Sequence, residues 1–187
     1  MKRFVVVLSL LAAFPVYTHA QSATEEIARA VMAAPPALAA DAAVVRLTDD
    51  GSREMLRDGT NGLVCYDRSN EPGRDFSAQC TSMGNLARAG QNHQVWMSSA
   101  NAEEARAMFA SQENDGSREA PVFGSVWYTL AGSDQASAST NTSHITIAVP
   151  FSTSDTIGFP SEGSYGESGS WIMEAGTSNA HLMIPGR

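Results

Sequence analysis

The first twenty residues constrain the fold most, because they have the pattern of a segment that is removed before the chain folds. Lys2 and Arg3 give a positive start, residues 4–14 form an almost unbroken apolar run, and small residues lead to Ala20. A charged start, an apolar middle of about ten residues and a small-residue exit make up a secretory signal peptide. We therefore predict that residues 1–20 are cleaved and that residues 21–187 form the mature chain.

An uncleaved membrane anchor is the alternative interpretation of this segment. Its apolar middle falls short of the roughly 20 apolar residues that a spanning helix needs. Neither cysteine lies near the expected cut, so a lipid anchor on cysteine is not indicated. We expect a periplasmic or secreted protein with no membrane attachment after cleavage, whose partner is an envelope or extracellular molecule that the sequence does not identify.

Two cysteines, Cys65 and Cys80, are present in the whole chain. An isolated, even pair in an oxidising compartment indicates a disulfide. Closing a loop of this length stabilises the fold by roughly 3 kcal/mol in the chain-entropy model. The alternatives are a metal pair or a reactive thiol, but cysteines that bind zinc usually stand two to four residues apart and a second such pair is missing.

The charge balance excludes one class of partner. Removal of Lys2 and Arg3 changes the formal net charge from −8 to −10 and leaves a chain without lysine. Nucleic acids and anionic membranes need a positive patch for their phosphates, so we expect neither as a partner. An acidic surface also serves solubility, and it identifies no positively charged partner.

The first half of the mature chain predicts one helix followed by strands. Ser22 and Glu25 have capping-box spacing before an alanine-rich helix over residues 24–34, which Pro35 and Pro36 end. β-Branched residues and turn clusters predict strands over residues 43–47, 53–57 and 63–66. The polar residues 67–79 are predicted to be an unstructured loop, and residues 81–94 stay undecided because glycines interrupt a helix-tolerant stretch.

The second half predicts another helix and then more strands. Asn101 and Glu104 are spaced to cap a helix that ends at residues 114–117. Strand-like runs follow at residues 121–130, 145–149, 171–175 and 181–184, with long polar or Gly/Ser-rich connections between them. Helices and strands do not alternate as βαβ units. We therefore predict one α+β domain over residues 21–187, in which an N-terminal and a mid-chain helix pack on an antiparallel sheet.

His144 and His181 each open a predicted strand, and Met183 lies on the same strand face as His181. If the two strands pair, the imidazoles are expected near one end of the sheet. Imidazole and thioether together suit Cu(I), so His144, His181 and Met183 form a candidate copper or zinc site. Against this site, the chain lacks the spaced methionines expected of a dedicated copper carrier, and Met183 is more simply explained as a core residue. Histidines that start strands also commonly hydrogen-bond to loops.

Other chemical signatures are weak. Ser168 stands in a Gly/Ser-rich segment that begins like a nucleophile elbow but lacks its last glycine and precedes a strand. The acidic pairs 49/50, 103/104 and 113/115 fit turns and helix ends better than a calcium loop.

Adjacent Trp127 and Tyr128 must face opposite sides of a strand, so at least one is expected in the core. Glycine-rich phosphate-binding patterns are missing, and we expect no cofactor.

Three segments carry a resemblance to a known family. They are Ala30-Val-Met-Ala-Ala-Pro-Pro-Ala-Leu38, Gly59-Thr-Asn-Gly-Leu-Val-Cys65 and Trp171-Ile-Met-Glu-Ala-Gly-Thr-Ser-Asn-Ala-His-Leu-Met-Ile-Pro185. In these segments the chain resembles a family of small exported bacterial proteins of unknown function. Between residues 80 and 101 the resemblance is poor. It implies export and a shared fold, and it supplies no catalytic residue.

These observations favour a non-enzymatic binding or accessory module that binds its ligand through its late loops. One alternative is a hydrolase with His144 or His181 as general base, because imidazole titrates near neutral pH. The other is the copper or zinc protein with ligands His144, His181 and Met183. The three hypotheses share an exported α+β domain with a Cys65–Cys80 disulfide.

Overall fold

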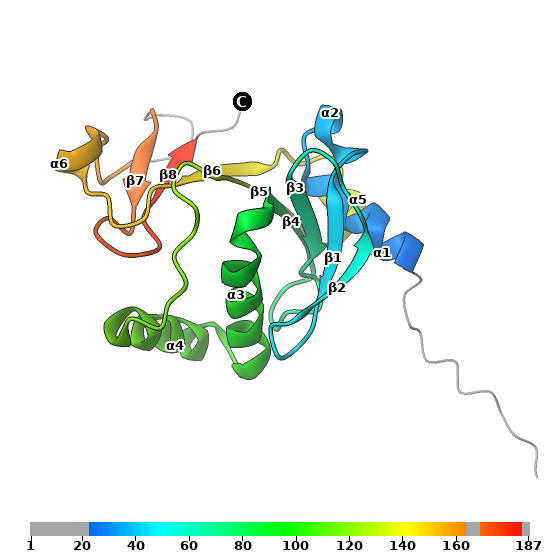
Figure 1. The fold of residues 1–187 in the computed structure, drawn as a ribbon, viewed down its shortest axis with the longest axis horizontal. Coiled ribbons are helices and arrows are strands. Elements are labelled where there is room, and N and C mark those ends of the chain that lie inside the picture. The colour runs from blue at the N-terminus through cyan, green and yellow to red at the C-terminus, as the bar shows by residue number, and fades with distance from the viewer. Residues whose placement is uncertain (1–22, 164–168, 185–187) are drawn as a thin grey trace, which may run out of the picture.

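The computed structural model describes residues 23–163 and 169–184, which fold around one sheet (Figure 1). The helices are α1 (Ala23–Ala30), α2 (Pro36–Ala39), α3 (Leu86–Ser98), α4 (Ala102–Asp115), α5 (Gln135–Ala138) and α6 (Ser154–Ile157), with the 3-10 helices η1 (Val31–Ala33) and η2 (Met83–Asn85). The strands are β1 (Ala43–Leu47), β2 (Arg53–Arg57), β3 (Leu63–Asp67), β4 (Phe76–Ser82), β5 (Val126–Gly132), β6 (His144–Ala148), β7 (Trp171–Met173) and β8 (His181–Ile184). The predicted signal peptide and Ser168 lie outside the described residues.

The strands form one continuous eight-stranded sheet in the order β2-β1-β3-β4-β5-β6-β8-β7. Neighbouring strands are antiparallel except for the β1–β3 pair, which is parallel. The predicted α+β class, with helices packed on a mostly antiparallel sheet, is confirmed. Within the described residues no helix is both long and apolar enough to cross a membrane.

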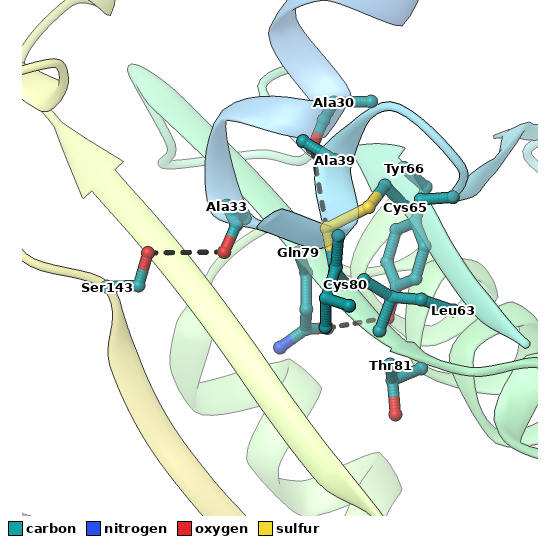
Figure 2. The surroundings of a disulfide bond; sticks show 12 residues. Ala30, Ala33, Ala39, Leu63, Cys65, Tyr66, Gln79, Cys80, Thr81 and Ser143 are labelled. Atoms are coloured by element: carbon teal, nitrogen blue, oxygen red, sulfur yellow. Dashed lines mark hydrogen bonds between the residues drawn. A yellow bond between two sulfur atoms is a disulfide. The ribbon is translucent and has the colours of Figure 1, made fainter. Parts of the chain in front are cut away.

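One face of the sheet is covered by α1, η1 and α5 and is apolar. We call it the disulfide face, because Cys65 and Cys80 lie directly opposite each other on β3 and β4 and are bonded beneath these helices. Figure 2 shows Ala30 and Ala33 close to the two sulfur atoms, and the carbonyl oxygen of Ala30 lies 3.7 Å from Cys80 Sγ. The predicted disulfide is confirmed, and it joins two neighbouring strands under a layer of small side chains.

The other face is partly covered by α3, and we call it the charged face. The strand register places Tyr66 opposite Gln79 and Gln79 opposite Thr129 on this face. Trp127, two residues from Thr129, shares the face and lies opposite Thr146. Side chains directly opposite each other on paired strands share a face. Tyr66 and Trp127 pack with Leu86 of α3, whereas the polar members approach buried ionic groups.

Several local predictions need correction. The polar stretch 67–79 contains the start of β4, because alternate residues of this strand are polar and point to the charged face, where Gln79 hydrogen-bonds to Thr129 at 2.8 Å. Pro35 and Pro36 do follow the end of the first helical stretch at Ala33, but Pro36 also starts a further short helix: it occupies the first turn of α2, where a missing N–H is tolerated. The undecided stretch holds most of α3, which continues to Ser98. At Gly90 of this helix the backbone of Gly51 approaches so closely that a Cβ would meet its oxygen at 2.2 Å.

The mid-chain helix was predicted correctly. The Asn101 side chain accepts hydrogen bonds of 3.0 Å from the backbone N–H groups of Glu103 and Glu104, as its capping spacing indicated. Gly116 ends α4 in the left-handed conformation that favours glycine. This helix packs against α3 and faces the loop between β7 and β8 across a cleft.

Candidate functional site

A buried carboxylate organises the charged face. Glu71 follows β3, its side chain is 1 % exposed, and it receives hydrogen bonds from Arg68, Arg74 and His93. Arg68 Nη2 lies 2.7 Å and Arg74 Nε lies 2.6 Å from Glu71 Oε2, while His93 Nδ1 lies 3.1 Å from Oε1. Burial raises the pKa of Glu71, but the His93 hydrogen bond and the two guanidinium charges outweigh it and lower the pKa to about 2.

Ionised Glu71 therefore fixes the Arg68 guanidinium in place at the end of β3. The carboxylate also sets the tautomer of His93, because an acceptor at Nδ1 requires that nitrogen to carry the hydrogen. The second nitrogen of His93, Nε2, is buried without a hydrogen-bond partner among the described residues. Since two guanidinium groups surround one carboxylate, this cluster has a net positive charge.

A second arginine, Arg88, is held differently. It lies in the first turn of α3 and is 2 % exposed. Its Nη2 donates to Asn179 Oδ1 at 2.6 Å, and its Nη1 donates to Ser178 Oγ at 3.0 Å and to the Glu119 carbonyl oxygen. No carboxylate lies within ion-pair distance of Arg88 in the part of the chain that the structure describes. Burial lowers the pKa of Arg88, and the charge of nearby Glu113 partly opposes this effect.

Arg68 and Arg88 line a common cavity of about 140 Å³, which we call the arginine cavity. Its walls come from the strands β4, β5, β6 and β8, from α3 and from the β7–β8 loop, and among the described residues the lining includes no Asp or Glu. The remaining lining residues are Gln79, Asn92, Pro121, Trp127, Thr146, Ala148, Asn179, Ala180 and His181. In a protein with a formal charge of −8, this cavity concentrates positive charge and hydrogen-bond donors.

A larger cleft of about 580 Å³ adjoins the arginine cavity, since Asn92 and Asn179 line both. We call it the aromatic cleft. Trp96 of α3 and Phe109 of α4 meet edge to face on its wall, with ring centroids 6.1 Å apart. The Arg118 guanidinium stacks 4.3 Å from the Phe109 ring centre. Burial and the charge of Arg88 lower the pKa of Arg118 to about 10, so it stays cationic at neutral pH.

The β7–β8 loop closes this cleft from the far side. Ser178 donates through its Oγ to Glu113 of α4, and its backbone N–H lies 3.1 Å from the other oxygen of that carboxylate. Asn179 links the loop to α3 through Arg88, and its Nδ2 donates to Glu174 at 2.7 Å. Hydrogen bonds thus hold the β7–β8 loop against both α3 and α4, and these contacts fix the walls of the arginine cavity.

The predicted site residues His144, His181 and Met183 line a third hollow, of about 470 Å³, together with Gly163, Trp171, Met173 and Glu174. The expectation that both imidazoles lie at one end of the paired strands is wrong. Because β6 and β8 are antiparallel, His181 lies opposite Ala148, at the other end of β6 from His144. Burial lowers the pKa of His144, and the charge of His181 lowers it further.

The other candidates have structural environments. Trp127 is buried under α3, whereas Tyr128 packs on the disulfide face, as expected for adjacent strand residues. The acidic pair 49/50 forms a turn in which Asp50 accepts from Thr48 and Ser52. Glu113 lies in the last turn of α4, as expected, and its carboxylate also binds the β7–β8 loop.

Sequence reasoning missed Arg68, Glu71 and Arg88. The spacing of Arg68, Glu71 and Arg74, three residues apart in turn, was the local signal for an ionic cluster in a loop. Arg88 had no comparable signal, because its partners Ser178 and Asn179 lie about ninety residues further along the chain.

The fold and these hollows define an α+β protein with one disulfide, a buried arginine cavity and an adjoining aromatic cleft. Comparisons with models of known families, with curated proteins and with solved structures found no match.

Proposed function

We propose that this chain is an exported, non-enzymatic binding protein whose ligand is a small organic anion. The ligand's carboxylate enters the arginine cavity, and its apolar body lies in the aromatic cleft. The observation that carries the proposal is Arg88: a guanidinium that is 2 % exposed, that lines a cavity, and that is held by neutral oxygens alone among the described residues. The resemblance to small exported bacterial proteins agrees with the proposed location.

Electrostatics supports an anion in the arginine cavity. A buried cation without a direct ion pair is costly. The charges of Glu113, Glu174 and Glu119 act on Arg88 without contacting it, and a carboxylate that accepts from its remaining N–H groups supplies a direct partner. Arg68 stands on the same cavity wall and belongs to a cluster with two guanidinium groups and one carboxylate. Since a liquid water occupies about 30 Å³, the cavity has room for a carboxylate and a few further atoms.

The aromatic cleft supports a ligand with an apolar body. Small-molecule sites typically measure 300–1,000 Å³ and combine apolar walls with a few placed polar groups. The cleft has this size, and Trp96 and Phe109 supply flat apolar surface beside the entrance at Asn92 and Asn179. The late β7–β8 loop forms one wall, in agreement with the expectation that the late loops bind the ligand.

The first test is a panel of acids and their uncharged amides. Benzoate, phenylacetate, succinate and glutamate are compared with benzamide and phenylacetamide by thermal shift and then by calorimetry. We expect phenylacetate or benzoate to raise the Tm in proportion to the logarithm of its concentration, because a ligand of the folded state stabilises it. The amides are expected to leave the Tm unchanged. If no acid of the panel binds, the proposal is wrong.

Two substitutions locate the site. Ala148→Val adds two methyl groups to the cavity wall and removes no hydrogen bond, so we expect at least a tenfold loss of affinity. Arg88→Lys keeps the charge and loses the planar fork, with a similar expected loss. Ala131→Val is the control, since Ala131 lies exposed on β5 away from the cavity. Equal affinity in the wild type and in Ala148→Val would place the ligand elsewhere and overturn the proposal.

A third substitution separates the two parts of the site. Trp96→Leu removes the aromatic wall of the cleft and leaves Arg68 and Arg88 in place. We expect this variant to weaken phenylacetate binding more than succinate binding, because succinate has no ring to pack on the wall. Equal weakening of both ligands would contradict the assignment of the apolar body to the cleft.

The hydrolase alternative stays a prediction. His181 Nδ1 lies 2.7 Å from the Asn179 carbonyl oxygen, so its Nε2 is the nitrogen that can accept a proton. A hydrolase of this kind loses turnover on His144→Ala or His181→Ala while its Tm stays unchanged. The binding proposal expects no turnover by either variant or by the wild type.

A further inference from the structure

The third hollow lies beyond the arginine cavity, at the β6–β8–β7 end of the charged face, and we call it the histidine–methionine groove. Its shape follows from the register. Met183 lies opposite Thr146 on one side and Trp171 on the other, while His181 lies opposite Met173. His144 lies two residues before Thr146 and so shares its face. The groove therefore gathers two imidazoles and two thioethers from three neighbouring strands.

The hydrogen bond at His181 prepares it as a ligand. Its Nδ1 lies 2.7 Å from the carbonyl oxygen of Asn179, which accepts only, so Nδ1 carries the hydrogen and Nε2 carries the lone pair. Histidines that bind metals usually donate their other ring N–H to a carbonyl or carboxylate in this way, which fixes the tautomer and the ring.

The sulfur donors are placed beside this imidazole. Met183 is 3 % exposed and lies two residues from His181 on the same face, and Met173 is 39 % exposed on the edge strand directly opposite His181. Trp171 is buried beside Met183, and Gly163 packs so closely on its ring that a Cβ would meet it at 2.5 Å. A buried thioether and an exposed one thus flank the same imidazole.

The donor set selects the type of ion. The described residues contain no group of three or more His, Cys, Asp or Glu side chains that could hold a metal. Zinc sites rest on such groups, so the structure gives the zinc alternative no ligand set. Thioether sulfur is a soft donor that favours Cu(I), and imidazole also suits copper.

We propose that the histidine–methionine groove binds one Cu(I) ion through His181 Nε2, the Met183 thioether and the His144 imidazole. Met173, at the exposed edge, is the sulfur at which the ion enters and leaves. The site is separate from the anion site of the proposed function, although His181 lines both hollows. No redox step is involved, because the ion binds and leaves as Cu(I).

The test is an anaerobic competition between the purified protein and a chromophoric Cu(I) chelator. We expect one Cu(I) per chain in the wild type. Met183→Leu keeps an apolar side chain of similar volume and removes the sulfur, so we expect its affinity to fall at least tenfold. His181→Gln is expected to lose more, since it removes the preorganised nitrogen. X-ray absorption of the loaded wild type should show sulfur scattering that Met183→Leu loses.

Matched controls make the result specific. Met55→Leu and Met83→Leu remove exposed sulfurs away from the groove and are expected to leave the Cu(I) affinity unchanged. Ag(I) should compete for the site, whereas Zn(II) should not. If the wild type fails to take Cu(I) from the chelator, or if Met183→Leu binds as tightly as the wild type, the proposal is overturned. Trp96→Leu, which alters the aromatic cleft and no residue of the groove, is expected to retain Cu(I) binding, which keeps this test independent of the anion test.

Discussion

The two faces of the same sheet bury different kinds of side chain. The disulfide face is an apolar cluster in which alanines of α1 and η1 pack with larger side chains such as Phe76 and Leu130, and Cys65 and Cys80 are bonded within it. The charged face buries Glu71 and Arg88 and encloses the arginine cavity. Burying charge rarely adds stability over a well-packed apolar core. The contrast between the faces therefore supports the proposal that the ligand binds on the charged face.

The largest expected effect is loss of the buried carboxylate. Glu71→Gln leaves Arg68 and Arg74 without their anion, and breaking a buried ionic pair typically costs about 3–5 kcal/mol of unfolding free energy. Urea denaturation measures this change. Glu54→Gln is the matched control, because Glu54 is an exposed partner of Arg46, and we expect a change within about 0.5 kcal/mol. Similar costs for the two variants would contradict the central place of Glu71 on the charged face.

Acid should lower the stability of the fold by protonating the same carboxylate, Glu71. The pKa of Glu71 falls from its ordinary value of 4.5 to about 2 in the folded protein. Because the pKa of Glu71 is lower in the folded state than in the unfolded state, the ionised carboxylate stabilises the fold above about pH 4.5. This stabilisation disappears as the pH falls from about 4.5 to about 2. The shift corresponds to about 3 kcal/mol. Denaturation at a series of pH values should show this loss in the wild type and a flatter profile in Glu71→Gln.

The disulfide face is tested by removing its bond. The double variant Cys65→Ala, Cys80→Ala should lose roughly 3 kcal/mol of unfolding free energy, because the unfolded chain regains the entropy of an open loop. Since the bond lies on the opposite face from the cavity, the folded variant should bind the anion and Cu(I) as the wild type does. Denaturation combined with both binding assays measures this independence. Weaker ligand binding in the folded variant would show that the two faces are coupled.

The contrast between the faces also explains which parts of the structure the sequence predicts. Local signals sufficed for α4, where Asn101 and Gly116 mark both ends, and for β8, where apolar residues follow His181. The cysteine count sufficed for the disulfide. β4 was missed although its residues alternate between apolar (Phe76, Ala78, Cys80) and polar (Ser77, Gln79, Thr81), which is the pattern of a half-buried strand. The polar residues before Phe76 hide the point at which this alternation begins.

The metal site of His144, His181 and Met183 stays a prediction. Strand periodicity correctly places His181 and Met183 on one strand face, and all three residues line one hollow. The arginine cavity was not found, since Arg88 depends on contacts with a loop that is distant in sequence. Long-range ionic contacts leave no periodic trace, whereas strand faces do.

The last prediction makes the same substitution on both faces of the sheet. Its expected effect on the unfolding free energy is the smallest, and it tests the difference between the two faces most directly. Ala78 on β4 and Ala148 on β6 are both buried strand residues, at 0 % and 2 % exposure. Valine has a high strand propensity at either place. Ala78→Val adds two methyl groups to the packed disulfide face, where overpacking costs about 1–3 kcal/mol. Ala148→Val adds them to the wall of the arginine cavity, where open space accepts them, and should change the unfolding free energy by less than about 0.5 kcal/mol.

Urea denaturation of the two variants measures the difference directly. An equal cost at both positions would mean that the cavity is as tightly packed as the disulfide face, and the assignment of binding to the charged face would then lose its physical basis.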